Sequence, residues 1–249
     1  MRQLAAFIII LFSAAAVLSA EPKSWYQPGD TLYVLAQSGL NLREKPGIDG
    51  KLVVKVPYGS KVTLQKDSGK PVPFVFENIK GAWVKAEFDG KQGYIFDGYL
   101  SSMPAPLQNG IKPALFREYL LSHFEVSGSP SESQEGDDAV LTHKKVTEFK
   151  NGITANVAVT VYNNKTPNFT REVYFFPNVY RIEEIFLLLK NLGYFHGDPN
   201  LLYPVSSQDA NKAGMEIKTA EGELRLIEGG MYILIFTSAD GVTLDIRNK

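Results

Sequence analysis

The chain has 249 residues, contains no cysteine and carries a formal net charge of −1. The lack of cysteine excludes disulfides, thiolate metal sites and a cysteine nucleophile. The near-zero charge argues against nucleic-acid binding, which requires a strongly basic surface. The charge is divided unevenly, because residues 30–103 carry ten Lys/Arg and eight Asp/Glu, whereas residues 112–249 carry fourteen and eighteen. Neither part is basic enough to change that conclusion.

The first twenty residues differ from the rest of the chain. Arg2 precedes the almost entirely apolar run Leu4–Leu18, and the small pair Ser19-Ala20 follows it. This pattern is typical of a secretory signal peptide, so residues 1–20 are predicted to be one, with cleavage near Ala20. The run is too short for a membrane-spanning helix, which needs about 20 apolar residues. The mature protein is therefore expected to be periplasmic or secreted, without a stable membrane anchor.

Short strands alternating with turns are predicted between residues 30 and 103. Runs rich in β-branched and aromatic residues mark five strands, and Asp89-Gly90 is a strong hairpin turn between the last two. The five strands are Thr31–Ala36, Lys51–Val56, Lys61–Gln65, Ala82–Phe88 and Gly93–Phe96. This density of short strands predicts a small β-barrel.

Residues 104–113 are predicted to be a linker between two domains. The segment around them, SSMPAPLQNGIKP, has three prolines and no alternating pattern. A helix is then expected to begin at Pro113. Apolar side chains and one histidine recur at helical spacing along it, namely Leu115, Phe116, Tyr119, Leu120, His123 and Phe124. The Ser/Gly/acid-rich segment Ser127–Asp138 that follows is expected to be a mobile loop.

Residues 114–249 are predicted to form an α+β domain with a mostly antiparallel sheet and two helices. Asn151-Gly152 joins a hairpin, and Gly193 suits the C-terminal cap of a second helix over Val179–Leu192. The chain ends in a meander with three glycine turns. The predicted strands are Val140–Phe149, Ile153–Tyr162, Phe169–Phe176, Met215–Lys218, Leu224–Glu228, Met231–Phe236 and Val242–Arg247. The fold class is therefore mainly β.

Residues 31–102 contain a series of short motifs. They are Asn41-Leu42-Arg43, Lys45-Pro46-Gly47, Gly81 with Trp83-Val84, Gly93-Tyr94-Ile95 and Tyr99-Leu100. The series resembles the bacterial SH3-like domain family, whose pattern is an Asn-aliphatic-Arg triplet with a Pro/Gly loop, a Gly-Trp-Val strand, a Gly-Tyr-aliphatic strand and a terminal Tyr-Leu. Two features depart from this pattern: Ala82 separates Gly81 from Trp83, and residues 66–80 form a long, hydrophobic insertion. In that insertion Phe74 and Phe76 favour an extra hairpin arm, a contact surface, or packing on the linker or the second domain.

The resemblance implies a binding role in the bacterial envelope, with peptidoglycan or an envelope protein or peptide as the partner. An aromatic groove between loops would stack on sugar faces or hold an extended peptide. The aromatic candidates for ligand binding are Tyr33, Tyr58, Trp83, Tyr94 and Tyr99. Some of these must belong to the core, and Trp83 is expected to serve packing first and groove lining second.

No catalytic residue, metal site or cofactor is assigned from the sequence. His123, His143 and His196 are isolated and lack metal-ligand spacing. His196 lies near Asp198, but we interpret this as a loop in which Asp198 stabilises a turn. The adjacent Glu183 and Glu184 point in different directions on a helix and are expected to form a solvated face.

Three functions stay open at this point. A binding protein of the envelope is favoured over an enzyme. The first alternative is a cell-wall hydrolase with its chemistry in the α+β domain, and the second is a structural scaffold.

Overall fold

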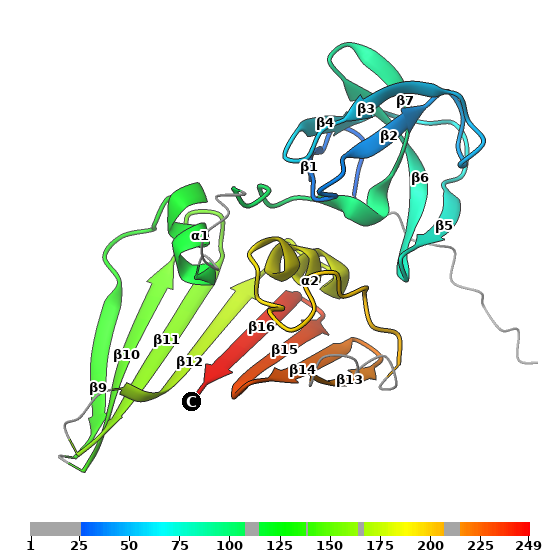
Figure 1. Cartoon of the computed structure of the whole chain (residues 1–249). Coiled ribbons are helices and arrows are strands. Elements are labelled where there is room, and N and C mark those ends of the chain that lie inside the picture. The colour runs from blue at the N-terminus through cyan, green and yellow to red at the C-terminus, as the bar shows by residue number, and fades with distance from the viewer. Residues whose placement is uncertain (1–25, 108–114, 138, 164–166, 207–214) are drawn as a thin grey trace, which may run out of the picture.

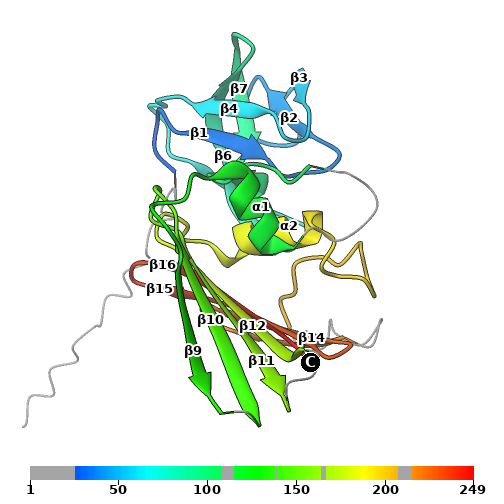
Figure 2. The same cartoon turned by 90° about the vertical axis from the view of Figure 1, so that its left-hand side faces the viewer.

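Two antiparallel β-sheets with two helices between them make up the computed structural model, which describes residues 26–107, 115–137, 139–163, 167–206 and 215–249. Figure 1 shows the small N-terminal sheet and the large C-terminal sheet, and Figure 2 shows helices α1 (Phe116–His123) and α2 (Ile182–Asn191) as the layer between them. The predicted fold class, mainly β with a small barrel followed by an α+β region, is confirmed. In the described part of the chain, no helix is long and apolar enough to cross a membrane. The predicted signal peptide lies outside the described residues.

The N-terminal sheet has the strand order β3-β2-β7-β6-β4-β1-β8, with β5 paired to β6 beside this path. All five predicted strands are present, and the Asn41-Leu42-Arg43 triplet forms a further one. Leu42, Ala86 and Ile95 are fully buried and belong to the barrel core. The strands are β1 (Thr31–Val34), β2 (Leu40–Arg43), β3 (Leu52–Val56), β4 (Lys61–Leu64), β5 (Val72–Phe76), β6 (Ile79–Phe88), β7 (Lys91–Phe96) and β8 (Leu100–Ser101), with the 3-10 helix η1 (Asp97–Tyr99) before β8.

The insertion at residues 66–80 forms a hairpin arm, one of the outcomes expected for it. β5 pairs with the first half of β6, and Glu77 and Asn78 join them with φ angles of 49° and 64°. Positive φ at both central residues is the signature of a type I′ turn, whose twist matches that of a β-hairpin.

The C-terminal sheet has the strand order β13-β14-β15-β16-β12-β11-β10-β9. The predicted hairpin around Asn151-Gly152 and the final meander are confirmed. α1 and α2 cover one face, where Phe116, Tyr174 and Ile185 are fully buried. The strands are β9 (Ser131–Gly136), β10 (Val140–Glu148), β11 (Thr154–Tyr162), β12 (Pro167–Phe176), β13 (Glu216–Ala220), β14 (Glu223–Glu228), β15 (Met231–Ser238) and β16 (Gly241–Asn248).

Two details of the predicted C-terminal region are wrong. Ser127–Asp138 is not a loop throughout, because Ser131–Gly136 forms edge strand β9 and pairs with β10. Its acidic side chains form cross-strand ion pairs, Glu132 with Lys145 and Glu135 with Lys144. The first helix begins at Phe116, and Leu115 is 46% exposed instead of packed. Pro113 lies outside the described residues.

Gly93, a signature glycine of the barrel, lies where a side chain has no room. A Cβ at this position would be 2.5 Å from the carbonyl oxygen of Arg43 and 2.9 Å from Leu42. We therefore expect Gly93→Ala to lower the free energy of unfolding by about 1–3 kcal/mol, measured by urea denaturation. Gly69→Ala is the control, because its added methyl meets only the Asp67 carboxylate at 3.6 Å. Equal effects of the two substitutions would contradict this account of Gly93.

Candidate functional site

The five aromatic side chains predicted to bind ligand do not form one site. Tyr58 donates a hydrogen bond to the carbonyl of Pro106 at 2.7 Å, so it holds the start of the linker. The Tyr33 ring lies 5.3 Å from the ammonium of Lys61. Trp83 and Tyr99 are buried, and Tyr94 is half-buried on β7.

Trp83 and Tyr99 belong to a cluster of five rings that the hairpin arm completes. Phe74 of β5 lies 5.6 Å from Trp83 and 5.3 Å from Phe96, measured between ring centroids. Tyr99 lies 6.2 Å from both Phe96 and Phe76. Cross-strand pairing of Trp83 with Phe96 places these two rings on the face opposite the barrel core. The insertion therefore gives the barrel a second, aromatic core.

Trp83 also lines a groove of about 190 Å³ between the segment Tyr26–Pro28 and the loop that precedes β5. Its side chain is 5% exposed, and its indole Nε1 has no hydrogen-bond partner among the described residues. Polar side chains surround it at the groove wall, namely Gln27, Gln65, Asp67 and Lys85. A buried N–H without an acceptor is costly, so this groove is the best candidate for a ligand that supplies a carbonyl or carboxylate oxygen.

Tyr94 stands beside this groove. It pairs across the strands with Lys85, one of the lining residues. Burial and a hydrogen bond with Asp67 raise the pKa of the Tyr94 hydroxyl above its ordinary value, so the phenol stays protonated at neutral pH. Of the five predicted residues, Trp83 is the one that lines this groove, and Tyr94 neighbours one of its lining residues.

The barrel and the C-terminal region are joined through Glu184 of α2. This residue was predicted to face solvent, and that prediction is wrong because its side chain is only 2% exposed. Oε1 accepts hydrogen bonds from the Ser101 hydroxyl at 2.7 Å and from the Ser102 amide at 2.8 Å and hydroxyl at 2.9 Å. Oε2 lies 3.0 Å from the Tyr26 hydroxyl. No sequence pattern distinguishes Glu184 from Glu183 beside it, which has the same carboxylate and stays partly exposed.

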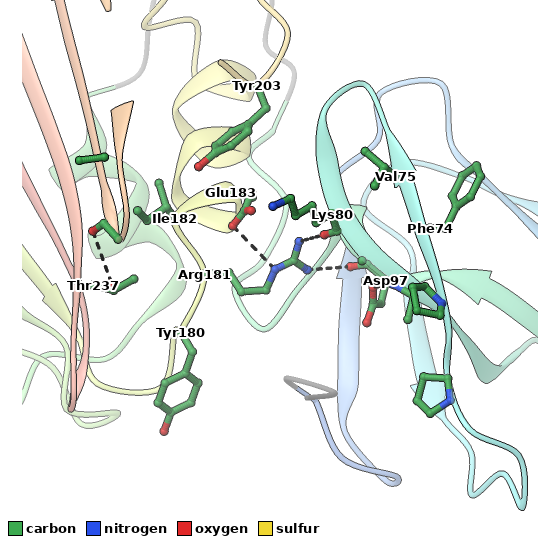
Figure 3. A pocket seen from close by; sticks show the side chains of 16 residues that line it. Phe74, Val75, Lys80, Asp97, Tyr180, Arg181, Ile182, Glu183, Tyr203 and Thr237 are labelled. Carbon is green, nitrogen blue, oxygen red and sulfur yellow. Dashed lines mark hydrogen bonds and ion pairs between the residues drawn. The ribbon is translucent and has the colours of Figure 1, made fainter. Parts of the chain in front are cut away.

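Arg181 forms a second contact between the two regions. Its guanidinium, which is 4% exposed, donates to the carbonyl of Lys80 at 2.7 Å and to that of Asp97 at 3.3 Å (Figure 3). Burial lowers the pKa of this guanidinium, but neighbouring Glu183, Tyr26 and Asp97 outweigh that effect and keep it above the ordinary value. Burial raises the pKa of Asp97, against the opposing effects of the Ala82 amide and Arg181. Arg181 is therefore charged and fixed to the backbone of the barrel.

A cleft of about 730 Å³ opens beside Arg181, between the hairpin arm and the start of α2 (Figure 3). The arm contributes Pro73, Val75 and Lys80, and the C-terminal region contributes Tyr180 and Tyr203 on the opposite side. This cleft combines residues more than 100 positions apart, so sequence patterns do not reveal it.

The three histidines lie on separate elements, His123 at the end of α1, His143 in β10 and His196 in the loop after α2. His196 is exposed, and Asp198 accepts a hydrogen bond from the Asn200 amide at 3.0 Å, as expected for a turn-stabilising residue. Nδ1 of His123 lies 2.9 Å from the carbonyl of Tyr119 in the preceding turn. In the described part of the chain, no group of three His, Asp or Glu side chains is placed to hold a metal ion.

The curved N-terminal sheet belongs to the class of small all-β barrels. Residues 38–101 match the family model of the bacterial SH3 domain, so this barrel is a bacterial SH3 domain. The match does not extend into the C-terminal region. No curated protein and no solved structure matches the chain. A bacterial SH3 domain indicates a binding role, often one connected with the cell wall.

The buried carboxylate of Glu184 gives a test of the joint between the two regions. Glu184→Gln replaces one carboxylate oxygen by a donor that opposes existing donors, so we expect a loss of about 1–3 kcal/mol in unfolding free energy. We also expect faster proteolysis in the linker after Ser102. Glu118→Gln on the exposed side of α1 is the control. Equal proteolysis rates for the two variants would contradict a joint at Glu184.

Proposed function

We propose that the protein is an exported binding protein of the bacterial envelope and that its SH3 domain recognises peptidoglycan. The observation that carries this proposal is a groove of a bacterial SH3 domain lined by Trp83, whose buried indole N–H has no acceptor among the described residues. Peptidoglycan supplies amide and acetamido oxygens that accept such a hydrogen bond. An envelope peptide would offer the same oxygens, so the choice between them needs a direct binding measurement.

The chemistry of the groove supports a polar, amide-rich ligand. Gln27 and Gln65 offer both donors and acceptors, and Asp67 and Lys85 offer one charge of each sign. Trp83 contributes a small apolar area to the groove wall, against which a sugar or a methyl group would pack. No strongly charged ligand is favoured, because the two charges balance.

Export rests on the N-terminal sequence alone. The predicted signal peptide places the mature chain in the periplasm or outside the cell. Because the chain has no cysteine, no disulfide forms within it under the oxidising conditions there.

Trp83→Phe tests the groove, because it keeps an aromatic ring and removes the N–H. We expect the mature chain, residues 21–249, to bind purified peptidoglycan sacculi about two- to tenfold more weakly, since one hydrogen bond contributes about 0.5–1.5 kcal/mol. Sedimentation with sacculi at a series of concentrations gives the affinity, and thermal unfolding checks that the variant is folded.

Tyr33→Phe is the matched control, because it also removes one donor from an aromatic candidate, on a ring beside Lys61 and not in the groove. Its binding to sacculi should equal that of the unaltered chain. Unchanged binding of folded Trp83→Phe would remove the groove from the proposal, and no binding of the unaltered chain would overturn it.

Export has its own test in cell fractions. In a bacterial host the full chain should appear in the periplasm or medium with a new N-terminus close to Glu21, as read by N-terminal sequencing. Deletion of residues 2–20 should leave the protein in the cytoplasm. An uncleaved full-length chain in the cytoplasm would contradict the proposed location.

A further inference from the structure

The hairpin arm exposes an unusual edge. Among the described strands, β5 pairs with β6 alone. Three of its five residues are large apolar side chains with high exposure: Val72 at 43%, Val75 at 57% and Phe76 at 51%. No other strand in the described ranges has more than one such residue. Proteins ordinarily avoid an exposed apolar edge, because it invites pairing with another strand.

The other edges of the two sheets carry the charges that discourage such pairing. β3 contains Lys55, β9 contains Glu132 and Glu135, and β13 contains Glu216 and Lys218. Of the described edge strands longer than two residues, β5 alone has no charged residue, its sequence being VPFVF. β5 therefore lacks the charges that protect the other edges, and Pro73 is its only residue of a kind that blunts an edge.

The contacts of β6 show which backbone N–H and carbonyl groups of β5 point to its free edge. The carbonyl of Lys80 accepts from Arg181, and the amide of Ala82 donates to the Asp97 carboxylate at 2.7 Å. The backbone groups of Lys80 and Ala82 therefore point away from β5. When two residues oppose each other in an antiparallel pair, their backbone N–H and carbonyl groups either point toward each other or both point away from the pair.

The partners of these two residues on β5 are Val75 and Pro73. Their backbone groups consequently point outward, at the free edge. Pro73 has no N–H, so Val75 supplies both an outward N–H and an outward carbonyl, and Pro73 supplies a second carbonyl. This arrangement can receive an extended chain through about three backbone hydrogen bonds.

Pro73 and Val75 line the cleft, and Tyr180 and Tyr203 of the C-terminal region line it as well. A strand added to β5 would direct alternate side chains to the same face, and so into this cleft. The charges there balance, with Lys80 and Arg181 against Asp97 and Glu183. The cleft therefore suits uncharged apolar or aromatic side chains.

We propose that β5 is a docking edge for an extended peptide segment of a partner protein, which pairs with β5 and places apolar side chains from every second position in the cleft. This site is separate from the Trp83 groove and goes beyond the function proposed for it. Backbone pairing provides the affinity, and the cleft provides the preference for apolar residues.

Val75→Pro removes the outward N–H and keeps the pairing of β5 with β6, because that N–H is not directed at β6. Pro73 already occupies an equivalent position in the same strand. Val75→Thr is the matched control, since threonine is also β-branched and retains the N–H. Two-dimensional amide NMR spectra of both variants verify that the arm is folded.

A displayed library of random twelve-residue peptides is the probe, selected against the mature chain, residues 21–249. The selected peptides should share apolar residues at every second position. The best one, made synthetically, should bind Val75→Pro at least tenfold more weakly and Val75→Thr within twofold, by fluorescence anisotropy. Two N-methylated forms of that peptide, one modified at its odd-numbered and one at its even-numbered residues, should differ. Only the form whose methylated amides face β5 should lose binding, as strand pairing requires.

Several results would overturn the proposal. One is a library without enrichment, and another is a selected peptide that binds Val75→Pro as well as the unaltered chain. A third is an equal loss of binding for the two N-methylated forms of the peptide. Weaker binding of Val75→Pro to peptidoglycan sacculi would instead assign the edge to the cell wall. The proposal at Trp83 is tested independently, because Trp83→Phe should leave peptide binding within twofold.

Discussion

The relation between the barrel and the sheet depends on two charged side chains in one turn at the start of α2. Glu184 and Arg181 are 2% and 4% exposed. Removing a charged group from water costs free energy unless polar groups of the protein replace the lost water molecules as hydrogen-bond partners. The barrel supplies those partners, as hydroxyls and an amide for Glu184 and as two backbone carbonyls for Arg181. The geometry of hydrogen bonds is narrow, so these contacts fix the barrel in one orientation on the helix. A purely apolar contact would hold the two regions together without setting that orientation.

This fixed orientation is what creates the cleft. Arg181 binds the carbonyl of Lys80 on β6, so the hairpin arm is held beside α2 at a set distance. Neither the SH3 domain nor the C-terminal sheet encloses the cleft alone, because each contributes one wall. Sites at the boundary of two regions are common for ligands. Their shape depends on the joint as much as on the residues that line them.

Local signals predicted most of the fold, and long-range contacts account for what they missed. The Asn151-Gly152 and Asp89-Gly90 turns and the apolar alternation around them act over a few residues, so the hairpins were predictable. Strand β9, with the sequence SESQEG, has no apolar alternation and exists through its pairing with β10. Glu184 is buried because the barrel lies over it, which no neighbouring residue indicates. Among the aromatic candidates, only the structure separates Trp83, which lines a groove, from Tyr58, whose hydroxyl binds the linker.

The residues shared with the SH3 family mainly build the barrel, whereas the departures from the family pattern build the new surfaces. Arg43 binds the carbonyl of Gly50 at 2.7 Å, and Gly93 gives the room for close strand packing. The insertion at residues 66–80 and the extra residue Ala82 belong together, because Ala82 lies in the part of β6 that pairs with β5 and its amide binds Asp97. One face of the resulting arm completes an aromatic cluster with Trp83, and the other face forms a wall of the cleft. A change that lengthened β6 therefore altered both surfaces at once, so the particular ligands of this protein should depend on the arm more than on the signature residues of the barrel.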